Sequence, residues 1–219
     1  MKTSATAVHI AQSDRHFART NRQTIRQRAD ILAALGFTAP TIAEICCGDC
    51  RRQQAIYQER LQTAHYCGLD ISPDIVALNQ ANGVACRLGD ALDEVAIGHF
   101  VASDVIFFGP PLSAACDGHT ALFFQAITPG FAPFAHLLLH KLSYEGLLVC
   151  IMPNSVNMGD IRWLYQQIRA YRPDVGVRLL HYSYTTLTGA DEETERRLKY
   201  VELWLGATWP DLWEVWESG

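Results

Sequence analysis

Four short apolar segments of this chain each end in residues that suit ligand binding better than packing. These ends read Cys46-Cys47-Gly48-Asp49-Cys50, Asp70-Ile71, Gly89-Asp90-Ala91 and Gly109-Pro110-Pro111-Leu112. A glycine after a strand lets the backbone turn sharply and approach a ligand, and the N-terminus of the next helix favours an anionic group. Carboxylates at the following ends can accept hydrogen bonds from hydroxyl groups. The four ends together predict one ligand-binding site.

The elements that must position these residues alternate along the chain. Short apolar or β-branched runs predict strands at 41–47, 65–70, 84–88, 104–108 and 146–152. Segments of helical length predict helices at 52–62, 73–81, 119–127, 131–144 and 160–171. This alternation favours a parallel sheet covered on both faces, with ligands beyond the carboxyl ends of its strands. Two further strands, 177–186 and 198–207, are joined by a loop too short for a crossover helix, so they are expected to pair antiparallel.

The order and spacing of these strand ends resemble the class I S-adenosylmethionine-dependent methyltransferases, from Thr41 to Ala207. The resemblance implies a Rossmann-like three-layer α/β sandwich, with a seven-stranded, mostly parallel sheet closed by a C-terminal antiparallel hairpin. Residues 39–219 would form the methyltransferase domain, and residues 1–38 an N-terminal helical extension. The resemblance also implies S-adenosylmethionine as the cofactor.

The segment from Cys46 to Cys50, after the first predicted strand, is called the first loop. There the resemblance makes Gly48 the central glycine of the family's glycine-rich turn. Cys46 and Cys50 stand where the family has its flanking glycines, and a thiol side chain is small enough to substitute. Glu44 takes the acidic position that faces the cofactor's amino group through the loop. A strand-to-helix turn without a ligand is the alternative.

At the next two strand ends, the resemblance assigns the nucleoside. In nucleotide-binding sites, an acid about 20 residues after the glycine accepts hydrogen bonds from ribose hydroxyls, and Asp70 follows Gly48 at close to this spacing. Ile71 would lie against the adenine ring, and Asp90 with Ala91 would lie at its exocyclic nitrogen. NAD presents the same ribose, but the G-x-G-x-x-G pattern of dinucleotide-binding loops is missing. A dehydrogenase is therefore the weaker interpretation.

The fourth end indicates the acceptor. Gly109-Pro110-Pro111-Leu112 resembles the diproline motif of methyltransferases that act on planar amino nitrogens, although Gly109 replaces a polar residue and Leu112 an aromatic one. Two consecutive prolines fix the backbone, so that a carbonyl can accept a hydrogen bond from an amine and aim its lone pair at the methyl group. We expect these four residues to be catalytic. A rigid loop without this role is the alternative.

Other chemistries fit the first loop less well. Cys47-Gly48-Asp49-Cys50 is a C-x-x-C at a helix start, where a thiolate pKa would be lowered, as in redox proteins. A structural zinc site needs four ligands, and no second C-x-x-C or closely spaced Cys/His pair supplies the rest. We therefore expect no metal. A module that binds a nucleotide without reacting remains a further alternative.

Two amphipathic faces outside the site suggest partners. Arg15, Arg19, Arg22 and Arg26 recur at helical spacing opposite apolar residues, in a chain whose net charge is −5. This stripe can follow an RNA or DNA backbone, so a nucleobase is one expected acceptor; the alternatives are a solvated face and a small-molecule acceptor. Near the other end, Trp209, Trp213 and Trp216 share a helical face that suits docking on the domain or an oligomer contact.

Composition sets the broad class. Hydrophobic residues make up 49% of the 219 residues and charged residues 19%, which is enough to bury a sizeable core. No apolar run approaches the roughly 20 residues of a membrane-spanning helix, and the first residues resemble no secretory signal. The seven cysteines fall mostly in apolar runs, as is typical of a reducing compartment. We expect a cytoplasmic protein that does not bind membranes.

Overall fold

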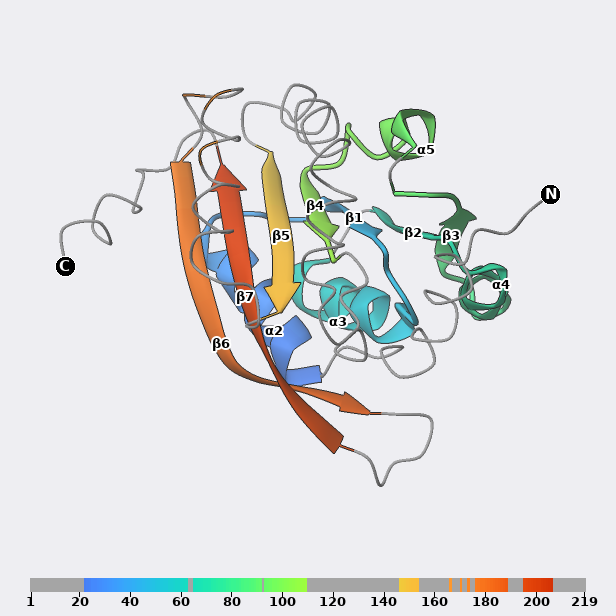
Figure 1. The fold of residues 1–219 in the computed structure, drawn as a ribbon, viewed down its shortest axis with the longest axis horizontal. Coiled ribbons are helices and arrows are strands. Elements are labelled where there is room, and N and C mark those ends of the chain that lie inside the picture. Colours follow the sequence, from blue (N-terminus) through green and yellow to red (C-terminus); the bar gives the residue numbers. More distant parts are fainter. Residues whose placement is uncertain are drawn as a thin grey trace, which may run out of the picture.

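A mixed β-sheet organises the computed structural model, which describes residues 22–62, 65–91, 93–109, 146–153, 166, 170, 173, 176–188 and 195–206. The sheet is seven-stranded and has the order β3-β2-β1-β4-β5-β7-β6 (Figure 1). Its strands are β1 (Thr41–Ile45), β2 (His65–Asp70), β3 (Ala85–Leu88), β4 (Val105–Phe108), β5 (Leu147–Pro153), β6 (Gly176–Thr188) and β7 (Glu195–Gly206). The first five strands are parallel, and β7 runs antiparallel to both β5 and β6. The prediction of a Rossmann-like, mostly parallel sheet with a C-terminal antiparallel pair is confirmed.

The closing pair is longer than predicted. The polar segment expected to form its loop partly continues the ladder, because Leu187 pairs with Arg196 and Thr188 with Glu195. A register shift between Tyr182 and Thr185 interrupts the pairing. Figure 1 shows this end of β6 and β7 extending away from the other strands. Backbone pairing of two long strands thus overrides the polar composition there.

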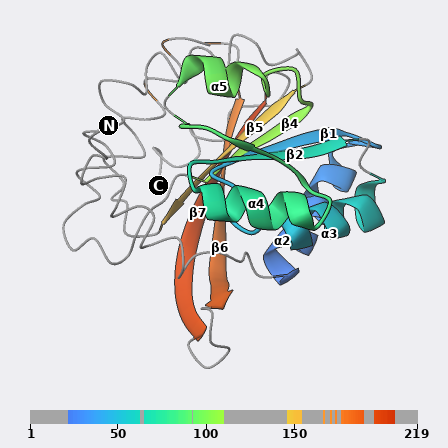
Figure 2. The same ribbon diagram turned by 90° about the vertical axis from the view of Figure 1, so that its right-hand side faces the viewer.

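Helices cover both faces of the parallel part. They are α2 (Arg22–Ala34), α3 (Arg51–Leu61), α4 (Pro73–Ala81) and α5 (Glu94–Gly98). Figure 2 shows α2, α3 and α4 on one side of β1 and β2, and α5 on the other. The short α5 was not predicted; Asp93 caps it by accepting a hydrogen bond from Val95 N at 2.9 Å. None of the described helices is long and apolar enough to cross a membrane.

Three predicted helices fall largely on parts of the chain that the structure does not describe. The helices expected at 119–127 and 131–144 lie entirely outside the described residues. In the segment 160–171, residues 166 and 170 are described and are helical.

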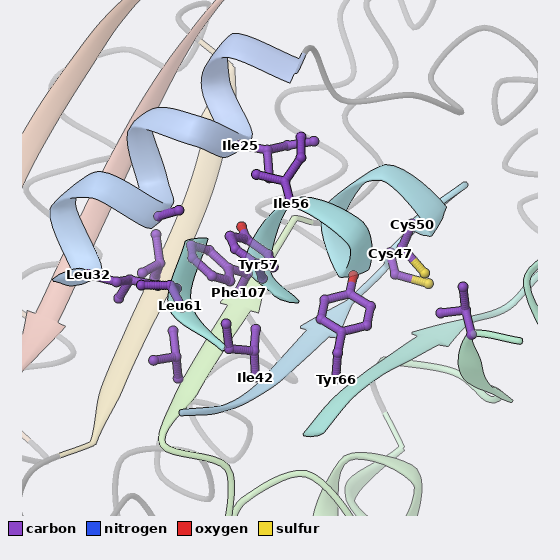
Figure 3. Packing of buried hydrophobic residues seen from close by; sticks show 14 of the residues in the cluster. Ile25, Leu32, Ile42, Cys47, Cys50, Ile56, Tyr57, Leu61, Tyr66 and Phe107 are labelled. Carbon is purple, nitrogen blue, oxygen red and sulfur yellow. The ribbon is translucent and has the colours of Figure 1, made fainter. Parts of the chain in front are cut away.

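The main core lies between α2, α3 and the sheet (Figure 3). The apolar face of α2 is buried as its spacing predicts, through Ile25, Ala29 and Leu32. Across this core, the Tyr57 and Phe107 rings stack with centroids 5.9 Å apart. Burial of each large side chain stabilises the fold by about 1.5–3 kcal/mol, so α2 is held firmly against α3 and the strands.

Candidate functional site

The first loop leaves β1 in a conformation that favours glycine. Cys46 has φ 61° and Gly48 has φ 55°, so both backbones are left-handed. Cys47 between them is tied to the neighbouring strand, since its N–H donates to Leu69 O at 3.0 Å. A side chain in this conformation costs about 1–2 kcal/mol, which Cys46 incurs and glycine avoids. The backbone therefore turns at Cys46 as it would at the glycine that the resemblance expects there.

Asp70 meets this loop at the end of β2. One carboxylate oxygen accepts from Gly48 N and the other from Ser72 N, each at 2.9 Å. Burial raises the pKa of Asp70, while these backbone N–H groups oppose the rise by stabilising the ionised form. A carboxylate has about four acceptor positions, so Asp70 can still accept a hydrogen bond from a ligand hydroxyl. The structure thus brings Gly48 and Asp70 together at the ends of adjacent strands, and the role of Asp70 toward ribose hydroxyls stays a prediction.

Asn79, which sequence reasoning missed, clamps the same loop from α4. This side chain is fully buried. Its Nδ2 donates to Gly48 O at 2.8 Å, and its Oδ1 accepts from Cys50 N at 3.2 Å. The sequence could have indicated this residue, because Asn79 comes three residues after the apolar Val76 and therefore lies on the same inward face of α4. A buried amide needs partners, and here the partners are the two sides of the loop.

The third strand end lies beside the second. Gly89 N donates to Asp70 O at 3.0 Å, and Asp90 and Ala91 follow directly. Asp90 is exposed and Ala91 half-buried, while Ile71 is 38% exposed beyond β2. The exposed side chains of Ile71 and Asp90 therefore follow two adjacent strand ends beside Asp70. The roles given to Ile71, Asp90 and Ala91 stay predictions.

Gly109 lies where the order of the sheet reverses. β1 has β2 on one side and β4 on the other, and such a switch point is where open α/β sheets bind ligands. Gly109 N donates to Ile45 O at 3.1 Å, so the residue that precedes the diproline adjoins the first loop. Pro110, Pro111 and Leu112 lie outside the described residues.

Glu44 lies beneath the loop, facing the interior. Its Oε2 accepts from Tyr66 OH at 2.6 Å, and its Oε1 is 3.8 Å from Arg28 Nη1. Burial raises the pKa of Glu44, and Arg28 and Tyr66 counteract part of that rise. The expected role toward the cofactor's amino group stays a prediction, and the structure gives Glu44 a set of internal partners as well.

Arg28 is the second residue that sequence reasoning missed. Its Nε and Nη2 bond Glu202 Oε1 at 2.9 and 2.7 Å, and Trp204 Nε1 donates to Glu202 Oε2 at 3.0 Å. Burial disfavours the charged guanidinium, but the carboxylates outweigh this and raise the pKa of Arg28. The sequence could have indicated this buried charge, because Arg28 lies between Ile25 and Leu32 on the apolar face of α2. This ion pair connects α2 to β7 through the core.

The arginine stripe is described only in part. Arg22 and Arg26 are exposed on α2. Arg15 and Arg19 lie outside the described residues, as do the three tryptophans of the C-terminal face. The expected partners at both surfaces stay predictions.

The C-x-x-C does not have the electrostatics of a redox motif at a helix start. The pKa of Cys47 is raised by its hydrogen bonds to Cys50 and Cys86 and by burial. The pKa of Cys50 is also raised, because burial and a hydrogen bond to Cys86 exceed the opposing effect of Cys47. Within the described ranges, no group of three or more His, Cys, Asp or Glu side chains is suited to hold a metal ion.

Solved structures share this architecture. No protein-family model matches the chain, and no curated protein does. The plantazolicin methyltransferase in complex with S-adenosylhomocysteine is 14% identical, with a TM-score of 0.56, over 93% of this chain and 91% of that one. A precorrin-6y C5,15-methyltransferase from Geobacter metallireducens is 12% identical, with a TM-score of 0.54, over 84% and 87%. An adenosylmethionine-dependent methyltransferase from Archaeoglobus fulgidus is 10% identical, with a TM-score of 0.53, over 84% and 94%. The likeness shows that this chain has the fold of these methyltransferases.

Proposed function

We propose that the chain is an S-adenosylmethionine-dependent methyltransferase that methylates a planar amino nitrogen. One observation carries the proposal: three strand ends meet at the switch point of the sheet. There, Gly48 N lies 2.9 Å from an Asp70 oxygen, and Gly109 N lies 3.1 Å from Ile45 O. Solved neighbours of the same fold include a methyltransferase in complex with S-adenosylhomocysteine, which supports the cofactor.

The residues present fit this cofactor. Asp70 is held in place by the backbone N–H groups of Gly48 and Ser72, and its carboxylate can still accept from a ribose hydroxyl. Ile71 offers apolar surface for the adenine, and Asp90 a nearby acceptor for its amino group. The left-handed turn at Cys46 and Gly48 keeps backbone close to the place of the amino acid tail. When bound, S-adenosylmethionine would supply a methyl group on positively charged sulfur.

The chain's contribution to the reaction is positioning. A neutral nitrogen is already nucleophilic, so the segment that begins at Gly109 needs to orient it and keep water out rather than supply a strong base. Gly109 offers a backbone without a side chain, which leaves room for a planar group. We propose a nucleobase in RNA or DNA as the acceptor, because the exposed Arg22 and Arg26 can contact phosphates.

Calorimetric titration with S-adenosylhomocysteine tests the cofactor. Asp70→Ala is expected to weaken binding at least tenfold, which corresponds to about 1.4 kcal/mol. Asp74→Ala is the matched control, because Asp74 is exposed in the first turn of α4 and should not affect binding. Failure of the native chain to bind, or equal effects of the two variants, would contradict the proposal.

Methyl transfer from labelled S-adenosylmethionine to bulk RNA, DNA and a mixture of small amines tests the acceptor. For a nucleic acid, binding should weaken steeply with salt, and Arg22→Gln with Arg26→Gln should reduce that slope by about 2. Transfer to small amines alone would replace the nucleobase with a small-molecule acceptor. Binding of the cofactor without any transfer would indicate a non-catalytic module.

A further inference from the structure

Three thiols from separate parts of the chain meet beneath the first loop. Cys47 follows β1, Cys50 precedes α3 and Cys86 lies in β3, and all three are buried. Figure 3 shows the sulfurs of Cys47 and Cys50 together beside Tyr66. Cys47 Sγ and Cys86 Sγ are 3.6 Å apart although β2 separates their strands. Gly68 in β2 permits this contact, since a Cβ there would lie 2.6 Å from Cys47 Sγ and 3.3 Å from Cys50 Sγ.

The thiols are chemically unequal. The pKa of Cys86 is lowered by its hydrogen bonds with Cys47 and Cys50, and Asn79 Nδ2 lies 3.7 Å from its sulfur. The pKa of Cys47 is raised, so Cys47 keeps its proton beside the Cys86 thiolate. A thiolate next to a protonated thiol is the arrangement of a peroxide-reactive cysteine and its resolving partner.

The strand that carries Cys86 borders open space. Cys86 contributes to the wall of a cavity of about 480 Å³ together with Cys67, His65, Arg87 and His99, whereas its sulfur lies on the other face of the sheet, toward Cys47 and Asn79. We propose that Cys86 and Cys47 form an oxidation site, at which hydrogen peroxide converts the pair to a disulfide and loosens the loop above it.

The chemistry balances with one equivalent of hydrogen peroxide. The Cys86 thiolate attacks one peroxide oxygen, the O–O bond breaks, and Cys86 becomes a sulfenic acid while hydroxide takes up a proton to become water. The Cys47 sulfur then attacks the Cys86 sulfur, loses its proton, and expels the sulfenic oxygen as a second water. Two thiols are oxidised to one disulfide, and the peroxide is reduced to two waters.

Disulfide formation must move the loop. The sulfurs have to approach from 3.6 Å to about 2.05 Å. Cys47 is bonded to Gly48, whose N–H holds Asp70 and whose carbonyl accepts from Asn79. Displacement of Cys47 therefore disturbs the contact that fixes Asp70. This consequence for ligand affinity rests on the proposed function, whereas formation of the disulfide does not.

Peptide mapping tests the disulfide directly. Trypsin cleavage after Arg28, Arg51, Arg60 and Arg87 gives peptide 29–51, which contains Cys47, and peptide 61–87, which contains Cys86. After treatment of the folded chain with hydrogen peroxide, non-reducing mass spectrometry should find these two peptides linked. Tandem fragmentation should place the link at Cys47 and Cys86. An internal link within 29–51, which would join two of Cys46, Cys47 and Cys50, or no link at all, would overturn the proposal.

Variants test the two sulfurs separately. Cys86→Ala and Cys47→Ser should each abolish the link between the peptides, and Cys67→Ser, in the same peptide as Cys86, should retain it. Circular dichroism of each variant shows whether it folds, and the mapping of the native chain decides the assignment if one of them does not. Persistence of the link in a folded Cys86→Ala chain would overturn the proposal.

Calorimetry with S-adenosylhomocysteine tests the consequence. Oxidation should weaken binding about tenfold in the native chain and in Cys67→Ser, with recovery after dithiothreitol, and should leave Cys86→Ala unaffected. A mapped disulfide with unchanged affinity would overturn the coupling to the loop. If the reduced chain does not bind the compound at all, the proposed function fails, while the mapped disulfide still establishes the oxidation site.

Discussion

Replacement of Arg28 by methionine should destabilise the fold far more than the same change at Arg26, on the same helix. Glu202 is fully buried, and without the guanidinium its remaining donor among the described side chains is the Trp204 indole N–H. Removal of one partner of a buried ion pair costs about 3–5 kcal/mol, because it leaves an uncompensated charge. Arg26 is exposed, so Arg26→Met should change the free energy of unfolding by no more than about 0.5 kcal/mol.

A double-mutant cycle separates the pair from simple loss of packing. Glu202→Gln keeps an acceptor for Trp204 Nε1 and should cost about 1–3 kcal/mol, because it leaves Arg28 with the more distant Glu44. Combining it with Arg28→Met should cost less than the sum of the two changes, with a coupling of about 1–3 kcal/mol. Urea unfolding followed by circular dichroism measures all four chains. Additive effects, or an Arg28→Met chain as stable as Arg26→Met, would refute the assignment of a buried ion pair.

Three further outcomes follow from the loop and its neighbours. Binding of S-adenosylhomocysteine should weaken as the pH falls, because only the ionised form of Asp70 accepts hydrogen bonds from the ribose hydroxyls. Burial raises the pKa of Asp70, so the midpoint should lie above the ordinary Asp value of about 3.9. Calorimetry across the acidic range measures this midpoint, and a value at or below about 3.9 contradicts the prediction. Cys46→Gly should raise the free energy of unfolding by about 0.5–1 kcal/mol by relieving the left-handed backbone, and a loss of stability in urea would disprove that strain. Gly68→Ala should lower the free energy of unfolding by about 1–3 kcal/mol, since the new methyl group would overlap Cys47 Sγ. Gly98→Ala is the control, because open space surrounds Gly98 and the fold should not be destabilised. Equal unfolding midpoints for the two variants would contradict this prediction.

Local patterns predicted most of the parallel half of the sheet and its strand ends. β2 and α4 have the expected bounds because apolar alternation and a helix-starting proline are written into a few adjacent residues. The link between Gly48 and Asp70 was also predictable, since it follows from a spacing that parallel strands impose. Such features depend only on residues within one strand-helix-strand unit.

The missed residues depend on contacts between distant segments. Arg28 and Glu202 are 174 residues apart, and each is unremarkable within its own segment apart from a charge on an apolar face. The thiol cluster likewise needs β3 beside β2 and a glycine at position 68, which no spacing within the first loop indicates. Local sequence therefore shows that a polar side chain faces inward but does not identify the partner that will satisfy it.

These two missed groups lie near one another beneath the same loop, since Tyr66 donates to Glu44 and also lies beside Cys47 and Cys50 (Figure 3), but they act on the loop differently. Arg28, Glu202 and Glu44 form a charged cluster beneath β1, built from elements at both ends of the chain. Cys47 belongs to the loop itself, and Asn79 links Cys86 to it, because its amide contacts both the loop backbone and the Cys86 sulfur. Because the charged cluster forms no contact with Gly48, its loss should lower stability before it alters ligand affinity. A change in the thiols should do the reverse, since a displacement of about 1.5 Å at Cys47 moves Gly48 and its contact with Asp70 directly.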